Sequence, residues 1–462
     1  MDTKEPSRNY SIVFMNCIGY SSISDSDKCV QMKPSYFWTN PNLSSAEGIQ
    51  ERQPFPKTEY LALWFPLLSE TFVYYEVEGL WKRKFPVAVV SLYGERSKFL
   101  AEHMRRSTIP VRHLGIPAIL SIAAAVVCRL FRQPRQVGRI LRTIVFHSWR
   151  DMEMRLENYW ACCCGIYLAE KFRREGVQHV HGAWASGPAT AAWVIHQLEG
   201  IPYSFTARAT DVRPPDGFLA EKLADCSFAR ADSSFNVPHL ASFLPETQKD
   251  KVCLVYNTVT LPSSEQAPVR MKPPYRIIAI GRLIEKKGFL YLVRAAGLLR
   301  RQNIDVEVTI VGGGGQMHAL KSEADAWHIQ DHVHFTGALP HDQIGGMLRQ
   351  SDIMVMPSIV PEGTEKSDGL PTVIVEAMSM GVPVVSTKVA SIGDVVKDGS
   401  TGCLVAQKDA AALAQAIRGL VEDRDKALEL AANARNVIRE MFSEENTLGR
   451  MLELFCKNAL YR

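Results

Sequence analysis

Several signals that would point to other classes of protein are missing from this sequence. The ten cysteines form no C-x-x-C pair, which argues against a zinc site or a disulfide framework and favours reduced thiols in the cytosol. The longest apolar run, 116–127, contains a proline and falls short of the roughly 18 residues that a membrane-spanning helix needs. The N-terminal region lacks the apolar core of a secretory signal peptide, so we expect a cytoplasmic protein.

A large excess of one charge is also absent. The chain has 53 Lys and Arg against 49 Asp and Glu, a balance that argues against a dedicated nucleic-acid-binding protein. Apolar residues make up 46% and charged residues 22%, which excludes wholesale disorder and a collagen-like repeat. The charge is placed unevenly, because residues 96–150 hold eleven Lys and Arg and one acidic residue, Glu102. We therefore expect one strongly basic surface.

Short apolar segments alternate with helical patterns along most of the chain. Residues 1–56 are rich in Ser, Asn and Pro, and we expect a flexible extension there. Two series of strand-like segments follow, separated by the Pro- and Ser-rich stretch 257–274. The first series comprises 60–65, 86–92, 177–181, 202–207, 226–231 and 252–256, and the second comprises 276–280, 306–311, 333–336, 352–356, 383–386 and 403–405.

Strands that alternate with helices predict parallel sheets built from βαβ units. The predicted fold class is α/β, with two doubly wound Rossmann-like domains at 57–262 and 263–440. A C-terminal helix within 441–462 is expected to pack back on the first domain. In this architecture the carboxyl ends of the strands of both sheets surround one interdomain cleft, where ligands bind. Functional residues should therefore follow strands.

One candidate binding loop follows strand 276–280 directly. The segment Gly281–Gly288 holds Arg282 and Lys287 between glycines that let the backbone approach a ligand. An arginine fork and a lysine point charge at this spacing suit a diphosphate group. A solvated basic loop is the alternative for such a segment in isolation, but its place after a central strand favours binding.

A second candidate segment, 357–381, follows strand 352–356. Pro371 suits the start of a helix that reaches Met380. The N-terminus of this helix would direct the positive end of the helix dipole and its free N–H groups into the cleft. Asp368 precedes this helix and Glu376 lies within it, roughly 10 Å apart by helix geometry. The two carboxylates can hold hydroxyls at two ends of a sugar nucleotide. The alternative for Asp368 is an N-cap, and the alternative for Glu376 is a buried, paired acid.

These segments resemble a known family. The stretch 276–405, with GRLIEKKG, IVGGGG, HFTG, an acidic residue followed after seven positions by Glu, and GVPVVST, resembles the nucleotide-binding half of the family 4 retaining glycosyltransferases of GT-B fold. FPLLSETFVYYEVEGL (65–80), HVHGAW (179–184) and IPYSFTARATDV (201–212) are similar to motifs of bacterial colanic-acid-type exopolysaccharide transferases.

The resemblance implies roles for individual residues. It places Arg282 and Lys287 on the donor diphosphate, Glu376 on the ribose and Asp368 on the donor sugar, and it counts Gly369 and Leu370 among the donor-binding residues. It implies that Ser69, Glu70, Thr71 and His181 lie near the acceptor. The catalytic group would be Arg208, Asp368, Arg282 and Lys287, working with retention of configuration and without a metal or another cofactor.

Departures from the family pattern keep two alternatives open. Arg208 stands where the family usually has His, and Arg cannot act as an acid or base near neutral pH, although it can stabilise developing charge. Ala183 replaces a second His of the relatives, and the string SIGD at 391–394 replaces Gly-Ile-Pro-Glu. The alternatives are a catalytically impaired scaffold in a polysaccharide assembly complex and a nucleotide-sugar 2-epimerase.

The basic segment 105–150 predicts a membrane contact. The apolar piece 116–127 is followed by Arg129, Arg132, Arg135, Arg139 and Arg142, which recur at helical spacing. Leu130, Val137, Ile140, Leu141 and Ile144 are expected to supply the apolar contacts. We expect docking on the anionic inner membrane, a solvated helix face being the alternative. The predicted function is transfer of a sugar, UDP-linked, to a lipid-linked oligosaccharide in bacterial exopolysaccharide biosynthesis.

Overall fold

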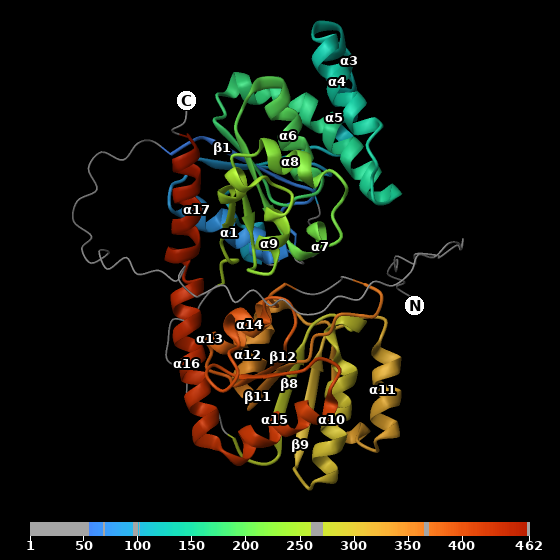
Figure 1. The fold of residues 1–462 in the computed structure, drawn as a ribbon, viewed down its shortest axis with the longest axis vertical. Helices are drawn as coiled ribbons and strands as arrows, with labels where there is room; N and C mark the ends of the chain where they lie inside the picture. Colours follow the sequence, from blue (N-terminus) through green and yellow to red (C-terminus); the bar gives the residue numbers. More distant parts are fainter. Residues whose placement is uncertain are drawn as a thin grey trace, which may run out of the picture. The chain divides into compact units, whose positions relative to one another are not determined.

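Two parallel β-sheets organise the chain in the computed structural model (Figure 1). The structure describes residues 55–67, 70–95, 100, 102–259, 271–364 and 369–459. The predicted extension 1–56 therefore lies outside the described residues except for its last two positions. We refer to residues 55–259 as the N-terminal domain and to residues 271–442 as the C-terminal domain.

The sheet of the N-terminal domain has seven parallel strands in the order β3-β2-β1-β4-β5-β6-β7. The strands are β1 Thr58–Ala62, β2 Val87–Ser91, β3 Val111–His113, β4 His179–Gly182, β5 Tyr203–Ala207, β6 Phe228–Ala231 and β7 Val252–Leu254. The helices are α1 Thr71–Lys82, α2 Glu102–Arg105, α3 Ile119–Arg132, α4 Pro134–Val145, α5 Met152–Glu175, α6 Gly187–Glu199, α7 Ala209–Val212, α8 Leu219–Asp225 and α9 Asn236–Ala241.

The sheet of the C-terminal domain has six parallel strands in the order β10-β9-β8-β11-β12-β13. The strands are β8 Tyr275–Ile280, β9 Val306–Val311, β10 Val333–Gly337, β11 Ile353–Met356, β12 Val384–Thr387 and β13 Cys403–Val405. The helices are α10 Phe289–Arg301, α11 Met317–Ala326, α12 His341–Gln350, α13 Thr372–Ser379, α14 Ile392–Val395, α15 Ala410–Glu422 and α16 Arg424–Phe442.

The predicted α/β class with two doubly wound Rossmann-like domains is confirmed. In each sheet the strand order reverses direction beside the first strand, between β1 and β4 and between β8 and β11. Ligands bind at such switch points, beyond the carboxyl ends of the strands. Helices cover both faces of the sheets, which explains why the strands are continuous apolar runs rather than alternating ones.

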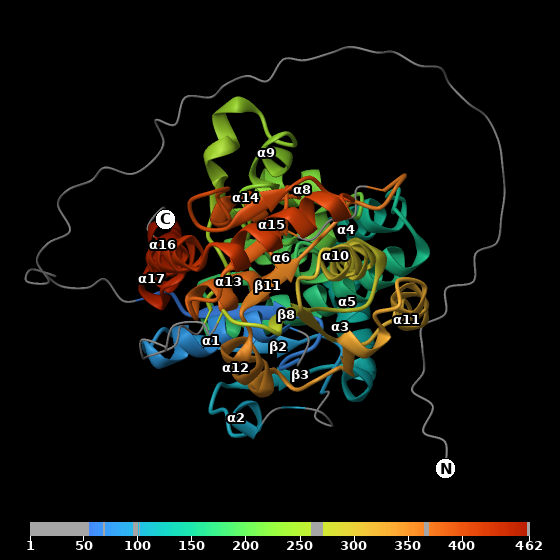
Figure 2. The same ribbon diagram turned by 90° about the horizontal axis from the view of Figure 1, so that it is seen from below.

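The last helix, α17 Glu444–Ala459, packs on the N-terminal domain although α16 belongs to the C-terminal one. Phe455 of α17 stacks on Phe85 with ring centroids 5.2 Å apart and meets Tyr60 edge-on. The hydroxyls of Thr447 and Thr258 are 3.0 Å apart. In Figures 1 and 2, α16 and α17 run along one side of the molecule, away from α3 and α11. This helix pair is therefore a second connection between the domains.

The five arginines of the basic segment lie on two helices, α3 and α4, rather than on one continuous helical face. The break falls at Gln133, between α3 and α4. Arg129 does not face solvent, because it is buried in ion pairs with Glu199 and Glu170. The expectation that all five arginines share one exposed face is therefore wrong. No helix in the described ranges is long and apolar enough to cross a membrane.

The apolar contacts of this segment also differ from the expectation. Val137, Ile140 and Ile144 are buried in the domain core and cannot meet a membrane. Leu130 is exposed, as expected, and further apolar side chains of the segment are exposed too, among them Ile116, Leu120, Val127 and Phe131. The correction has a simple cause, since helical spacing identifies two faces but does not say which one faces the protein.

Candidate active site

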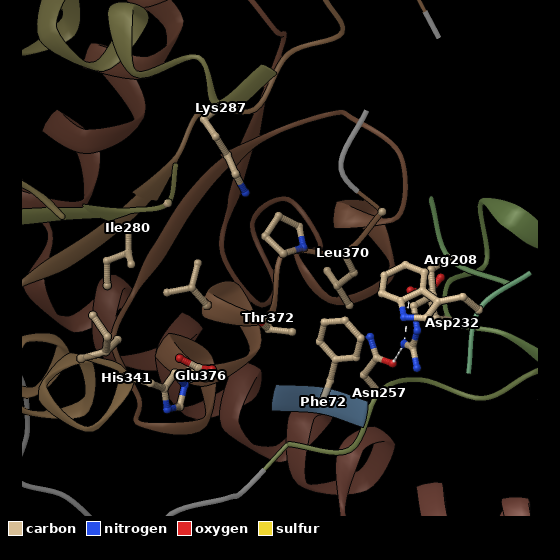
Figure 3. Close-up of a pocket in the computed structure, with 16 residues that line it drawn as sticks. Phe72, Arg208, Asp232, Asn257, Ile280, Lys287, His341, Leu370, Thr372 and Glu376 are labelled. Carbon is tan, nitrogen blue, oxygen red and sulfur yellow. Dashed lines mark hydrogen bonds and ion pairs between the residues drawn. The ribbon is translucent and has the colours of Figure 1, made fainter. Parts of the chain in front are cut away.

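A cavity of about 350 Å³ lies between the strand ends of the two domains, within the range of small-molecule sites (Figure 3). The N-terminal domain lines it with Phe72, Trp184, Arg208, Asp232 and Asn257. The C-terminal domain brings four residues singled out from sequence, Lys287, Gly369, Leu370 and Glu376. Arg208 and Asp232 are the first residues after β5 and β6, so parallel strands deliver their side chains to the same edge.

The loop after β8 places Lys287 on the cavity wall. A 3₁₀ turn spans Glu285–Lys287 and ends at Gly288, whose φ is +66°. A Cβ at Gly288 would lie 1.9 Å from the carbonyl oxygen of Pro357, so this glycine lets the loops after β8 and β11 touch. Arg282 is exposed on the same loop and is not among the residues that line the cavity.

Helix α13 begins at the cavity and carries Glu376 on its lining face. Pro371 occupies the N-cap position, and Pro371, Thr372 and Val373 all line the cavity. The first N–H groups and the positive end of the helix dipole thus point toward the space between the domains. Glu376 Oε1 is hydrogen-bonded to His341 Nε2 of α12 at 3.1 Å. Asp368 lies outside the described residues.

Arg208 is a buried cation on the opposite wall. Its side chain lies between aromatic rings, with the guanidinium carbon 4.4 Å from the centroid of Phe72 and 5.4 Å from that of Trp184. Its Nη1 donates a hydrogen bond to Asn257 Oδ1. Burial lowers the pKa of Arg208, and the nearby Arg230 acts in the same direction. A guanidinium nonetheless stays charged at neutral pH, so Arg208 is a fixed positive charge.

A second buried arginine lies beside Arg208. Arg230, on β6, forms a hydrogen-bonded ion pair with Glu76 of α1. The same carboxylate accepts a hydrogen bond from the Tyr60 hydroxyl at 3.0 Å. Arg230 also reaches Asn257 Oδ1 at 3.4 Å. The network ties α1, β1, β6 and the Asn257 segment together around the cavity wall.

The predicted acceptor residues fall into different surroundings. Glu70 accepts a hydrogen bond from Trp184 Nε1 at 2.9 Å, so it contacts a residue that lines the cavity. Burial raises the pKa of Glu70 above its usual value. Thr71 is the first residue of α1. Ser69 lies outside the described residues.

His181 is enclosed within the sheet and does not line the cavity. Its Nδ1 is 2.8 Å from Ser204 Oγ and its Nε2 is 3.0 Å from Thr206 Oγ1, both on β5. Burial lowers the pKa of His181 well below the usual range. The ring is therefore neutral at physiological pH, and both nitrogens are engaged in the protein interior.

Residues of the departing string at 391–394 make contacts across the domain boundary. Ser391 Oγ accepts a hydrogen bond of 2.9 Å from the backbone N–H of Phe235, across the domain boundary. Asp394 accepts hydrogen bonds from Ser234 and from the Tyr256 hydroxyl, the latter at 3.0 Å. These residues join the two domains beside the cavity.

Sequence reasoning did not select several of the lining residues. Among them are Phe72, Trp184, Asp232, Asn257 and His341. A signal was available for Asp232, a polar residue directly after a strand. No group of three or more His, Cys, Asp or Glu side chains arranged to hold a metal occurs in the part of the chain that the structure describes.

Comparison with protein families identifies the C-terminal domain. Residues 263–437 match the family model described as Glycosyl transferases group 1. The crystal structure of Anabaena Alr3699/HepE in complex with UDP and glucose resembles this chain with a TM-score of 0.61 at 16% identity, covering 87% of this chain and 99% of that chain. The fold is therefore GT-B, as predicted, with a C-terminal domain that matches group 1 glycosyl transferases.

Relatives of known name agree with this class. WcaL of Escherichia coli (strain K12), named for colanic acid biosynthesis, is 28% identical over 199 residues, 43% of this chain and 49% of WcaL. The amylovoran biosynthesis glycosyltransferase AmsK of Erwinia amylovora is 29% identical over 181 residues, 39% of this chain and 44% of AmsK. The matched regions thus span about half of these relatives. The matched regions are thus similar to parts of glycosyltransferases that are named for exopolysaccharide biosynthesis.

Proposed function

We propose that the chain is a retaining glycosyltransferase that moves a sugar from a nucleotide diphosphate donor, UDP-linked, to a lipid-linked oligosaccharide in exopolysaccharide biosynthesis. The observation that carries the proposal is the shared cavity, in which Lys287, the start of α13 and Glu376 face Arg208 and Asp232. The names of WcaL and AmsK support the exopolysaccharide context.

The donor diphosphate is assigned to Lys287 and the N-terminus of α13. A helix N-terminus offers free N–H groups to an anion, and a lysine adds a point charge. Arg282, outside the cavity lining, would approach the diphosphate from the solvent side. The leaving diphosphate gains charge as the glycosidic bond breaks, so these groups stabilise the transition state more than the ground state. No metal ion is required in this scheme.

The nucleoside and the sugar are assigned to opposite sides of the start of α13. Glu376, held by His341, would accept hydrogen bonds from the ribose hydroxyls. Asp368, Gly369 and Leu370 would contact the donor sugar. Arg208 cannot exchange protons, so its proposed catalytic role is to stabilise negative charge beside the reacting sugar.

The acceptor is assigned to the N-terminal wall of the cavity. Ser69, Glu70 and Thr71 precede or begin α1, and Glu70 fixes the indole of the cavity residue Trp184. His181 would act only through the sheet that carries this wall, because its side chain is buried.

Membrane docking is assigned to α3 and α4. Ile116 and Leu120 are each 84% exposed and Phe131 is 83% exposed. Exposed apolar side chains of this size are unusual on a soluble surface and suit insertion among lipid headgroups. Arg135 and Arg139 are exposed on the adjoining α4, and each cation near an anionic surface contributes about 1 kcal/mol. This surface would hold the enzyme at the inner membrane, beside a lipid-linked acceptor.

A panel of UDP-, GDP- and ADP-sugars tests the proposal by thermal unfolding. A ligand at 100 times its Kd stabilises the folded state by about 2.7 kcal/mol. We expect UDP-sugars to raise the unfolding temperature and the other nucleotides to have little effect, with and without EDTA. Stabilisation that disappears in EDTA would contradict the metal-free scheme, and no stabilisation by any nucleotide sugar would contradict the proposed donor site.

A further inference from the structure

Arg208 has more hydrogen-bond donors than its protein neighbours accept. It is 4% exposed and lines the cavity. Of its five N–H donors, one on Nη1 is bonded to Asn257. Glu76 Oε2 lies 4.0 Å from Nη2 and Asp232 Oδ2 lies 4.0 Å from Nη1, too far for hydrogen bonds. Its Nε has no hydrogen-bond partner among the described residues.

The neighbouring Arg230 is a buried arginine whose three nitrogens all donate hydrogen bonds within the protein. Its Nε donates to the carbonyl oxygen of Val255 at 2.9 Å, its Nη2 to that of Tyr256 at 2.8 Å, and its Nη1 to Glu76. It does not line the cavity. The two arginines lie beside the same carboxylate and the same asparagine. Each of the three nitrogens of Arg230 has a hydrogen-bond partner, whereas Nε of Arg208 has none among the described residues.

The chemical class of the ligand that Arg208 would bind follows from the shape of its guanidinium group. Buried donors without acceptors cost free energy, and a planar guanidinium matches the two oxygens of a carboxylate. The rings of Phe72 and Trp184 hold the guanidinium in place, which reduces the entropy lost on binding.

We propose that Arg208 binds the carboxylate of a hexuronic acid, carried either by the donor sugar or by the acceptor saccharide. This inference rests on the proposed function, because it assigns a substrate group within the same cavity. The diphosphate is a different anion with a different position: Figure 3 shows Lys287 and Arg208 on separate sides of the cavity, with Leu370 between them. In this inference Arg208 selects the sugar through its carboxylate, in place of the charge-stabilising role proposed above, whereas Lys287 holds the nucleotide.

Matched ligands test the inference in two arms. In the donor arm, calorimetry compares UDP-glucuronate with UDP-glucose, which share the diphosphate and differ at the C6 carboxylate. In the acceptor arm, the protein saturated with UDP is titrated with methyl glucuronide and with methyl glucoside. A hydrogen-bonded ion pair in a desolvated site predicts a preference of about 10- to 100-fold for the acidic ligand in one arm. Equal or weaker binding of the acidic ligand in both arms overturns the inference.

Two matched variants separate contact from general charge. Arg208→Lys keeps the charge but loses the fork, and we expect it to reduce the preference at least about fivefold. Arg349→Lys changes an exposed arginine that does not line the cavity, and the preference should survive. Equal losses in both variants would overturn the contact with Arg208. UDP alone serves as the check on the donor site: if it fails to bind wild type, the proposed function itself has failed.

Discussion

Ser234 Oγ donates a hydrogen bond of 2.5 Å to Asp394 Oδ1, and this contact joins the N-terminal domain to the C-terminal domain. The Tyr256 hydroxyl donates to the other carboxylate oxygen at 3.0 Å. Asp394 stands at a position where the sequence departs from the family pattern. The structure shows that this acid bridges the two domains.

Asp394→Ala should weaken the connection between the domains. It removes the acceptor of three partly buried hydrogen bonds to a charged group, which corresponds to about 1.5–3 kcal/mol. Urea unfolding of Asp394→Ala is expected to begin at a lower urea concentration than that of wild type. The unfolding curve of Asp394→Asn should lie between those of Asp394→Ala and wild type. Asp331→Ala, at an exposed acid, controls for charge. An unfolding curve of Asp394→Ala that overlays wild type would show that the bridge contributes nothing.

Glu376 and Asp368 should respond differently to amide substitution. Glu376→Gln is expected to weaken binding of UDP and of UDP-sugar alike, because both contain the ribose. Asp368→Asn should leave UDP affinity nearly unchanged and lower the transfer rate. Calorimetry with both ligands, together with a transfer assay, distinguishes the two. The opposite pattern would mean that the two assignments are exchanged or wrong.

Charge reversal on α4 should release the protein from anionic vesicles. Arg135→Glu with Arg139→Glu removes two favourable contacts of about 1 kcal/mol each and adds repulsion. Co-sedimentation with anionic vesicles should fall sharply and become less sensitive to salt. The matched control is Arg349→Glu with Arg424→Glu, at exposed arginines of the C-terminal domain. If both double variants sediment like wild type, α3 and α4 form an ordinary solvated surface.

The free energy of unfolding at acidic pH should depend on the protonation of His181. Burial lowers its pKa in the folded state, so the unfolded chain binds the extra proton below about pH 6.5. Its contribution to stability is complete above that pH and falls by about 1.4 kcal/mol per pH unit as the pH drops toward the folded-state pKa. His181→Gln should therefore reduce the slope of unfolding free energy between pH 6.5 and 5. An unchanged slope would show that the ring becomes protonated in the folded protein.

Much of the fold could be predicted because parallel strands buried on both faces are continuous apolar runs. Strand β3 was not predicted, since its three residues, Val111–His113, lie at the sheet edge and include an arginine and a histidine. Glu376 could be located because a proline after a strand marks the start of a helix. Its partner His341 could not, because that contact joins two separate helices.

The remaining site residues depend on contacts between distant parts of the chain. Arg230 and Glu76 are 154 positions apart, and no local pattern pairs them. The same limitation explains Arg129, whose partner Glu199 lies 70 positions away on α6. Helical spacing grouped Arg129 with the exposed arginines, whereas a buried acid on another helix determines which way it faces. Charged residues are thus hardest to interpret where they are buried in pairs.

The most direct test of the donor site compares two adjacent lysines. Lys287 lines the cavity and Lys286 does not, so Lys286→Ala is a control with the same change of charge in the same loop. Calorimetry should show that Lys287→Ala binds UDP about 10- to 100-fold more weakly than wild type, while Lys286→Ala stays within about threefold. Transfer by Lys287→Ala should fall roughly 30- to 1000-fold. Normal UDP binding by Lys287→Ala, or equal losses in the two variants, would contradict the assignment of this cavity to the nucleotide diphosphate.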